Sequence, residues 1–429
     1  MFKIFKNSWA LFTGFAVLIT AHGFQGNLLQ VRSVIENFSF ITTGIIMSAY
    51  FVGYFLGANM IPNIVSKVGH IRVFAAFASM ASLSVLIHVV FVDPIVWTLA
   101  RILTGFSMIG VYIVVESWLN DRATNRNRGG VLSIYMFITF TGMAVGTLLL
   151  NFNKPQEYEP FILISLLFSL ALVPILLTKR AAPKFKKISF MNIKQLYKIS
   201  PLGTFSMLCT GLIQSAIFGY GAVYAATLNF TLFEISLFLF LITIAGAIFQ
   251  FPIGYFSDMR DRRIVIIGCT FLSAIFCIFA IFFSGAALEN MYLASSVGMD
   301  KIMFLIFVTI YAGFALPMFT LNLAYVNDFI NRERFVAAGA GLQIIFAIGA
   351  MGGPILCSIF MDTLGPNGFF VYLGIIHILI GLFGMFRITK RNYEANPDST
   401  FTPLPRNITP LGIELDPTTA ADLSNDDQK

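Results

Sequence analysis

Long apolar runs cover almost the whole chain, and they constrain its fold more than any other feature. Each run approaches or exceeds the roughly 20 residues that an α-helix needs to cross a bilayer. We expect twelve spans, at 9–30, 42–65, 72–92, 95–119, 131–151, 160–178, 202–227, 233–256, 264–285, 302–326, 336–360 and 368–388. Strand-like alternation of apolar and polar residues is absent from these runs. The sequence therefore predicts an all-α membrane protein.

The composition agrees with lipid as the solvent for most of the surface. Hydrophobic residues make up 57% of the chain and charged residues 11%, whereas soluble domains carry roughly 25% charged residues. The net charge of +7 is spread over short basic clusters between the apolar runs, so a nucleic-acid partner is not predicted. The four cysteines all lie within apolar runs and show no metal-binding spacing. The sequence therefore predicts no metal and no cofactor.

The distribution of basic residues predicts the orientation. With the N-terminus in the cytoplasm, 24 of the 28 Lys and Arg residues fall on the cytoplasmic side. The first apolar run is too long for the core of a signal peptide and is expected to remain as a helix. We therefore predict a multi-pass protein of the cytoplasmic (inner) membrane with both termini inside.

The chain divides into two halves at a basic loop. Residues 179–200 contain seven Lys or Arg and no acidic residue, and they separate six spans in 1–178 from six spans in 201–390. This cytoplasmic linker could rest on the anionic inner leaflet as a short interfacial helix, or could reflect the positive-inside bias alone. The segment 391–429 is polar and rich in Pro, Thr and Asp, so we predict a disordered cytoplasmic tail.

The two halves repeat one another. Asn120-Asp121, followed by the run NRNR, matches Asn327-Asp328, followed by NRER, at offsets of 207 and 206 residues. Gly105-Phe106 matches Gly313-Phe314 in the same way. Paired six-helix halves are the architecture of secondary transporters, with the solute path between them near the midplane.

Several motifs resemble those of the major facilitator superfamily. The run Gly254-Tyr-Phe-Ser-Asp258-Met-Arg260-Asp-Arg262-Arg263 resembles its loop motif G-x-x-x-D-R-x-G-R-R, with Asp261 in place of the second glycine. Arg101-Ile-Leu-Thr-Gly105 resembles the R-x-x-x-G motif of its fourth span. The runs 68–79 and 116–129 resemble the bacterial YcaD-like branch, whose members have unassigned solutes. The resemblance implies two pseudo-symmetric six-helix bundles and transport by alternating access.

The resemblance also implies a cytoplasmic gate of ion pairs that tie neighbouring spans together. Asp328 is the expected partner of Arg262, and by symmetry Asp121 is the expected partner of Arg72. Simple anchoring by solvated charges is the alternative. The gate candidates are Lys67, Arg72, Asp121, Arg128, Asp258, Arg262 and Asp328.

Two charged residues inside span 4 do not recur in the second half. Arg101 corresponds to Thr309, and Glu116 corresponds to Leu323. Such charges are costly in a membrane and usually mark a functional cavity. Arg101 could bind an anionic solute or take part in proton coupling, or could donate to carbonyls of span 1. Glu116 could titrate during the cycle, or could pair with Arg72 or Arg128 at the gate.

Span 1 contributes His22 and Gln25, which lie three residues apart and are expected on one face. The complete set of solute and coupling candidates is Arg101, Glu116, His22, Gln25, Tyr112, Gln214 and Asn322. Tyr50, Tyr54, Gln250 and Gln343 are further polar or aromatic candidates within the spans.

These features predict a monomeric carrier that moves a small organic solute, coupled to protons. Arg101 favours an anionic or zwitterionic solute. Proton-driven efflux of drugs or metabolites is the main alternative, although span 5 has Gly142, Gly146 and Thr147 without the proline of the drug-antiporter pattern. A non-transporting sensor is a weaker alternative. An enzyme is not predicted, since the chain lacks a zinc-protease motif and a phosphate-binding glycine loop.

Overall fold

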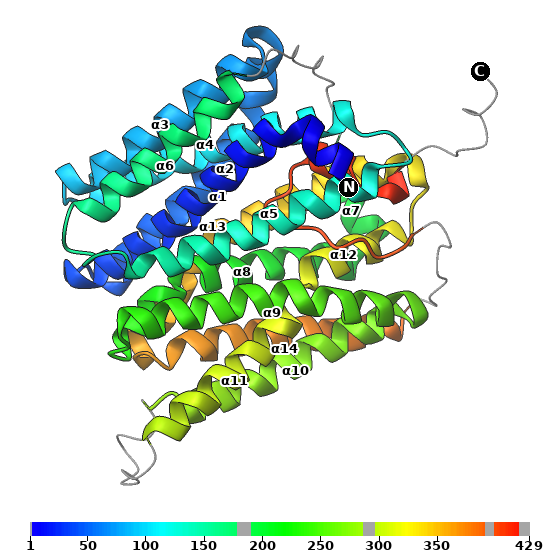
Figure 1. Ribbon diagram of the computed structural model, residues 1–429. Helices are drawn as coiled ribbons and strands as arrows, with labels where there is room; N and C mark the ends of the chain where they lie inside the picture. Colours follow the sequence, from blue (N-terminus) through cyan, green and yellow to red (C-terminus); the bar gives the residue numbers. More distant parts are fainter. Residues whose placement is uncertain (1, 178–189, 286–296, 391–398, 420–429) are drawn as a thin grey trace.

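The computed structural model describes residues 2–177, 190–285, 297–390 and 399–419, and it is built from α-helices (Figure 1). The first half contains α1 (Phe2–Ile35), α2 (Phe40–Val68), α3 (His70–Val90), α4 (Pro94–Arg122), α5 (Arg128–Leu148), the 3₁₀ helix η1 (Leu149–Asn151) and α6 (Glu159–Leu176). The short helix α7 (Ile193–Ile199) follows. The second half contains α8 (Pro201–Thr227), α9 (Leu232–Met259), α10 (Arg262–Phe283), α11 (Val297–Ala315), α12 (Met318–Asn327), η2 (Arg332–Arg334), α13 (Phe335–Leu364) and α14 (Gly368–Ile388). The chain ends with α15 (Pro410–Ile413) and η3 (Pro417–Thr419).

Within the described residues, 11 helical segments are long and apolar enough to cross a membrane. They agree with the predicted spans 2 to 12. The predicted first span lies in α1, which is a long helix but is not among the 11. Polar residues at 22, 25, 27 and 30 lower the hydropathy of α1. Thus α1 packs as part of the bundle although its composition is less apolar than that of the other spans.

Span 10 is interrupted, which the hydropathy pattern does not predict. α11 ends at Ala315 and α12 begins at Met318, with Pro317 between them. Proline has no N–H to donate and its ring obstructs the preceding turn, so a helix interior breaks there. The two pieces together still form one segment, Met299–Asn327, of spanning length.

The helices of the two halves pair in the same pattern. In the first half, α1 contacts α5 and α6, α3 contacts α4 and α6, and α2 contacts α4. In the second half, α8 contacts α13 and α14, α10 contacts α11 and α14, and α9 contacts α11. Each pair in one half has a counterpart in the other, as the sequence repeat predicts.

The halves contact each other directly at one end of the bundle, which we call the far end. There Gln30 donates to the carbonyl of Phe218 at 2.9 Å and accepts from the N–H of Ala222 at 2.9 Å. The Tyr220 hydroxyl donates to the carbonyl of Phe40 at 2.7 Å. These hydrogen bonds give partners to polar groups that would otherwise be buried unpaired at the interface. They hold the two halves together at the far end.

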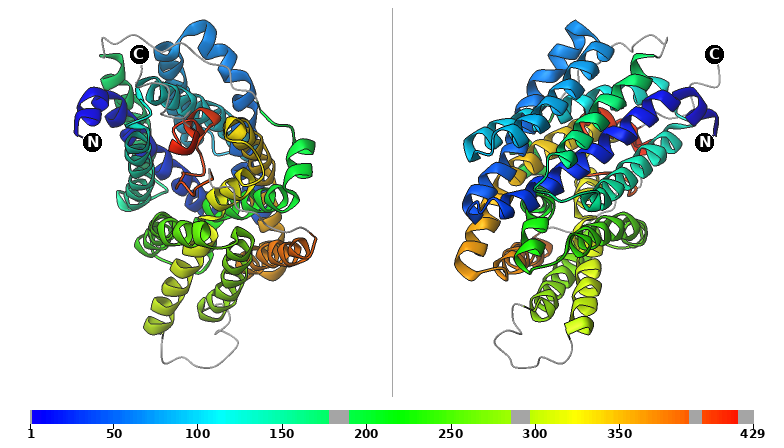
Figure 2. Two further views of the ribbon diagram at one scale, coloured as in Figure 1. Left: turned by 90° about the vertical axis from the view of Figure 1, so that its right-hand side faces the viewer. Right: turned by 60° about the vertical axis from the view of Figure 1, so that its left-hand side comes forward.

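The opposite end, which we call the tail end, is filled by residues 399–419, the tail segment. Figure 2 shows this segment, in red, inside the ring of helices and between the two halves. The prediction of a disordered tail is wrong for these residues, while 391–398 and 420–429 lie outside the described residues. The reason is that spaced apolar side chains within a polar sequence are buried: Leu404, Ile408, Leu411, Ile413 and Leu415.

The described part of the predicted linker contains a short helix. Residues 179–189 lie outside the described residues, and α7 covers Ile193–Ile199. Asn192 and Gln195 form a reciprocal cap at its start. Leu196 is buried while Lys194 is exposed. The helix therefore packs one apolar side chain against the second half and presents its charge outward.

Close packing of α2 against α4 leads to a prediction for Gly105. A Cβ atom at Gly105 would overlap the carbonyl oxygen of Tyr50, and one at Gly53 would overlap that of Ile102. We expect Gly105→Ala to lower stability by about 1–3 kcal/mol, since overpacking forces helices apart. Gly268→Ala is the matched control, because a Cβ there meets nothing within 4 Å. Thermal unfolding of both variants in detergent tests this, and equal melting temperatures would contradict it.

Candidate functional site

A cavity of about 120 Å³ lies between the halves and is bordered by the tail segment. The first half contributes side chains from α1, α2, α4 and α5, and the second half from α8, α9, α12 and α13. Tail residues 404–407 form a further part of the wall. No aspartate or glutamate is among the described residues that line this cavity. Its fixed charges are therefore those of Arg101 and Arg406.

Arg101 enters the cavity from α4 and is 5% exposed. Its guanidinium lies 4.9 Å from the centre of the Tyr50 ring. Among the described residues, Nε and Nη1 of Arg101 have no hydrogen-bond partner. The predicted alternative, donation to carbonyls of span 1, is not seen for these two nitrogens. A buried guanidinium in this state can bind an anion strongly, because its donors are free and little water competes.

The lining face of α1 differs from the predicted one. His22 lines the cavity and stacks on Tyr50, with ring centroids 5.3 Å apart. Gln25 is not part of the wall and donates instead to Thr104 on α4 at 3.3 Å. Asn27 lines the cavity and donates to Thr147. Residues three apart differ by about 60° around a helix, which is enough to turn Gln25 toward α4.

Of the next three solute candidates, two line the cavity and one lies outside its wall. Tyr112 and Gln214 line the cavity. Gln214 donates to the carbonyl of Leu316 at 2.8 Å, which orients its side chain. Asn322 is fully buried outside the cavity wall and donates to Thr210 at 3.0 Å. Four of the seven predicted residues therefore meet at one site, namely His22, Arg101, Tyr112 and Gln214.

Glu116 lies outside the cavity wall and is fully buried. Its carboxylate accepts from the hydroxyl of Tyr135 at 2.6 Å and from the N–H of Gly412 at 3.0 Å. It also accepts from the N–H and the hydroxyl of Thr409. Within the described ranges no ion pair joins Glu116 to Arg72 or Arg128, so that predicted alternative is not seen. The tail segment occupies its acceptor positions instead.

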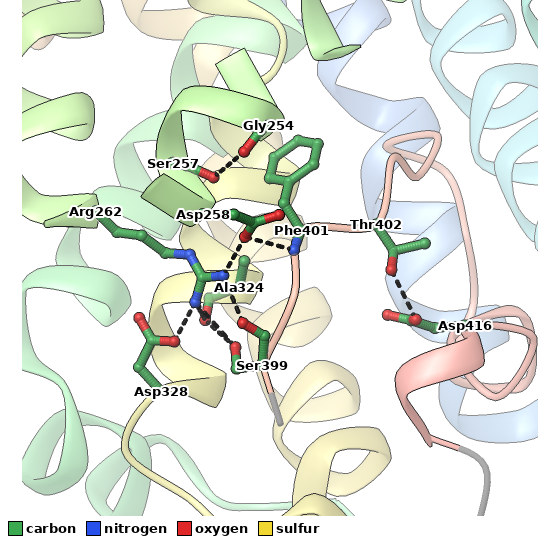
Figure 3. A network of polar contacts seen from close by, with 10 residues as sticks. All are labelled: Gly254, Ser257, Asp258, Arg262, Ala324, Asp328, Ser399, Phe401, Thr402 and Asp416. Carbon is green, nitrogen blue, oxygen red and sulfur yellow. Dashed lines mark hydrogen bonds and ion pairs between the residues drawn. The ribbon is translucent and has the colours of Figure 1, made fainter. Parts of the chain in front are cut away.

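Arg262 forms the predicted pair with Asp328 and joins it to other groups at the tail end (Figure 3). Its Nη2 lies 2.6 Å from Oδ1 of Asp258. Ser399 of the tail segment accepts from the same guanidinium through its hydroxyl at 3.0 Å and its carbonyl at 2.6 Å. The cluster therefore ties α9, α10 and α12 to the tail segment.

Among residues 2–177 of the first half, no equivalent cluster forms. Arg72 and Asp121 are both exposed, and no ion pair joins them in the described part of the chain. The predicted symmetric pair is therefore wrong for this state. Lys67 is exposed, and Arg128 donates to the carbonyl of Glu414 at 2.8 Å. In the second half Asp258 helps to hold Arg262 in place. The first half has Ser66 at the corresponding position, so it lacks an equivalent acid for Arg72.

Arg406 and Phe218 line the cavity and are missing from the predicted candidates. Arg406 lies with its guanidinium 3.4 Å from the centre of the Phe218 ring and donates to the carbonyl of Gln214 at 3.2 Å. The only sequence signal for Arg406 is its position between spaced apolar residues of the tail. Phe218 is one of 47 phenylalanines, and nothing in its local sequence distinguishes it.

Comparison with protein families finds one family whose model matches both halves of the chain. The model of the Major Facilitator Superfamily matches residues 8–299 and, separately, 203–418. A protein of Escherichia coli O6:K15:H31 (strain 536 / UPEC), "Uncharacterized MFS-type transporter YcaD", is 22% identical over 376 residues. The match covers 86% of this chain and 92% of the relative. The same protein of strain K12 / DH10B matches to the same extent.

Solved structures share the fold at low sequence identity. The nucleoside transporter NupG has a TM-score of 0.72 at 12% identity, over 90% of this chain and 99% of that one. A bacterial homologue of the human lysosomal transporter Spinster, inward-facing and occupied, has a TM-score of 0.66 at 13% identity, over 92% and 98%. A variant of the E. coli fucose:proton symporter, FucP, has a TM-score of 0.53 at 13% identity, over 90% and 99%. With family matches that span both halves, this chain belongs to the Major Facilitator Superfamily.

Proposed function

We propose that this protein is a proton-coupled secondary transporter that moves a small organic anion or zwitterion by alternating access. The observation that carries the proposal is the buried Arg101, which has two unpartnered nitrogens in a cavity whose described lining contains no acid. We propose further that it acts as a monomer in the cytoplasmic membrane, with both termini inside. The basic residues at the tail end, predicted to face the cytoplasm, support this orientation.

The charge of the cavity supports an anionic group on the solute. Isolated buried charges are unfavourable unless they are paired and hydrogen-bonded. Arg101 has an aromatic ring and open space beside it, and an incoming carboxylate would supply the missing acceptors. Cationic drugs would meet Arg101 and Arg406 without a compensating acid among the described lining residues, which disfavours cationic efflux.

The other lining groups support an organic solute with polar substituents. Tyr50, Tyr54 and Tyr112 provide aromatic faces, and Gln214 and Gln343 provide amides. Sites for organic ligands combine an apolar wall with a few oriented polar groups in this way. Two proteins of this fold carry organic cargo by name, a nucleoside transporter and a fucose:proton symporter. The second also supports coupling to protons.

Glu116 remains our candidate for the coupling group. It is a fully buried acid, and the structure gives it hydrogen-bond donors but no cationic partner within the described ranges. A carboxyl group in such surroundings can change its protonation when its partners change. Glu116 lies on the same helix as Arg101, about four turns farther along. This separation fits coupling through movement of the tail end and not through direct contact with solute.

The test is a solute panel with two readouts. We expect at least one carboxylate or amino acid to raise the melting temperature of the purified protein, because a ligand of the folded state stabilises it. In proteoliposomes the same solute should accumulate under an imposed pH gradient and stop accumulating when a protonophore removes the gradient. Movement of cationic dyes, with no carboxylate or amino acid bound or moved, would overturn the proposal.

A further inference from the structure

We propose that the tail segment is an intramolecular ligand that wedges the two halves apart at the tail end. Its receptor is the cleft between α4 and α13, with Glu116 as the central acceptor. While the segment is bound, the tail end cannot close, and residues 404–407 of the segment form part of the cavity wall on that side. The inference rests on the transport function proposed above, because a wedge of this kind matters only to a protein that alternates between two states.

The tail segment makes polar contacts with both halves. In the first half, Tyr54 donates to the carbonyl of Asn407 at 3.0 Å, and Asn120 donates to the carbonyl of Leu411. In the second half, the N–H of Phe401 donates to Asp258 at 2.9 Å. These contacts come from helices that belong to opposite halves, so the segment joins them across the opening.

The second half holds further backbone groups of the segment. Gln250 accepts from the N–H of Leu404 at 3.2 Å, and Arg332 donates to the carbonyl of Thr418 at 2.5 Å. The segment therefore has contacts with the second half near both its beginning and its end. Main-chain recognition of this kind fixes the path of a peptide without requiring a regular helix or strand.

The carboxylate of Glu116 is the main acceptor for the tail segment in the first half. The N–H groups of Thr409 and Gly412 and the hydroxyl of Thr409 all donate to its carboxylate. A Cβ atom at residue 412 would lie 2.7 Å from Cδ and 2.8 Å from Oε1 of Glu116, so only glycine allows this approach. Hydrogen bonds to a charged acceptor are about twice as strong as neutral ones. Apart from the segment, the donor to this carboxylate among the described residues is the hydroxyl of Tyr135.

The segment is also folded onto itself. Thr402 donates to Asp416 at 2.8 Å, which closes a loop over the residues that reach the cavity. The N–H of Thr418 donates to the same carboxylate at 2.9 Å. Burial raises the pKa of the Asp416 carboxyl, and these donors oppose that shift. The segment thus has a defined shape between the halves, as a docked ligand does.

The position of α15 explains why closure is blocked. α15 contacts both α4 and α13, and Leu411, Gly412 and Ile413 are buried there. Closing the tail end would bring the halves together through the volume that these residues occupy. Because protein interiors are close-packed and do not compress, the segment must leave before the halves can meet.

The test measures docking and closure separately, in the full chain with the four native cysteines replaced by alanine. Docking is measured by the rate at which Ile408→Cys, buried at 0% exposure, reacts with a maleimide. Closure is measured as the distance between spin labels at Arg126→Cys and Glu333→Cys, both exposed at the tail end in opposite halves. Neither readout needs a solute, so failure of the solute panel would leave this test intact.

Gly412→Val and Glu116→Gln are the test variants, and Thr400→Ala, an exposed tail position, is the control. We expect both test variants to react roughly tenfold faster at position 408, the effect of losing charge-assisted hydrogen bonds. They should also show a second, shorter spin-label distance that the control lacks. Unchanged reactivity in both variants would overturn the role of Glu116 as receptor. Faster reactivity without a shorter distance would overturn the wedge.

Discussion

Replacing Arg101 with glutamine should weaken binding of the transported anion and, in the same variant, stabilise the empty protein. Loss of one partner of a buried charge pair costs about 2–5 kcal/mol, so the Kd should rise at least roughly 30-fold. The empty protein holds a guanidinium with two unpartnered nitrogens, and removing that charge removes an unfavourable burial. Functional residues often reduce stability in this way.

The two readouts distinguish a binding role from a structural one. Thermal unfolding without ligand should give a melting temperature at or above that of the unaltered protein, and calorimetry or thermal shift should give the weakened binding. Arg101→Lys is the matched control, because it keeps the charge but loses the planar donor geometry. We expect the affinity of Arg101→Lys for the anion to lie between those of the unaltered protein and Arg101→Gln. A lower melting temperature with unchanged affinity would show that Arg101 supports the fold only.

Replacing Arg262 with glutamine should destabilise the protein by about 3–5 kcal/mol. Arg262 pairs with Asp258 and Asp328, and the side chain of Asp328 is 0% exposed. Breaking a buried ion pair leaves a buried charge without its counter-ion, which is the reason for an effect of this size. Thermal or denaturant unfolding in detergent measures it.

A double variant tests the reason for the effect. If the cost comes from the uncompensated Asp328, then Arg262→Gln combined with Asp328→Asn should be more stable than Arg262→Gln alone. Arg260→Gln is the control for surface charge, since Arg260 is exposed two residues away, and it should change stability by less than about 0.5 kcal/mol. Equal losses for Arg260→Gln and Arg262→Gln would contradict the prediction.

The Arg262–Asp328 pair was predictable because a repeat places it. The acid follows the same asparagine in both halves, at Asn120-Asp121 and Asn327-Asp328, and a loop motif supplies the arginine. The symmetric pair of Arg72 with Asp121 was not formed, although the same reasoning predicts it. A repeat conserves helix positions, but an ion pair also depends on neighbouring groups, and the first half has Ser66 where Asp258 stands in the second.

The sequence by itself determined the membrane class, spans 2 to 12 and the two-half repeat of this protein. Those properties follow from hydropathy and spacing along the chain, which need no knowledge of partners distant in sequence. Only the tertiary structure decided that His22 faces the cavity while Gln25 does not, and that Glu116 binds Thr409 and Gly412. Helix rotation and contacts across nearly 300 residues of sequence set these features. The position of the tail segment could not be predicted from the sequence either, because its apolar residues have no regular period. They are buried in the cleft that two separate helices, α4 and α13, form.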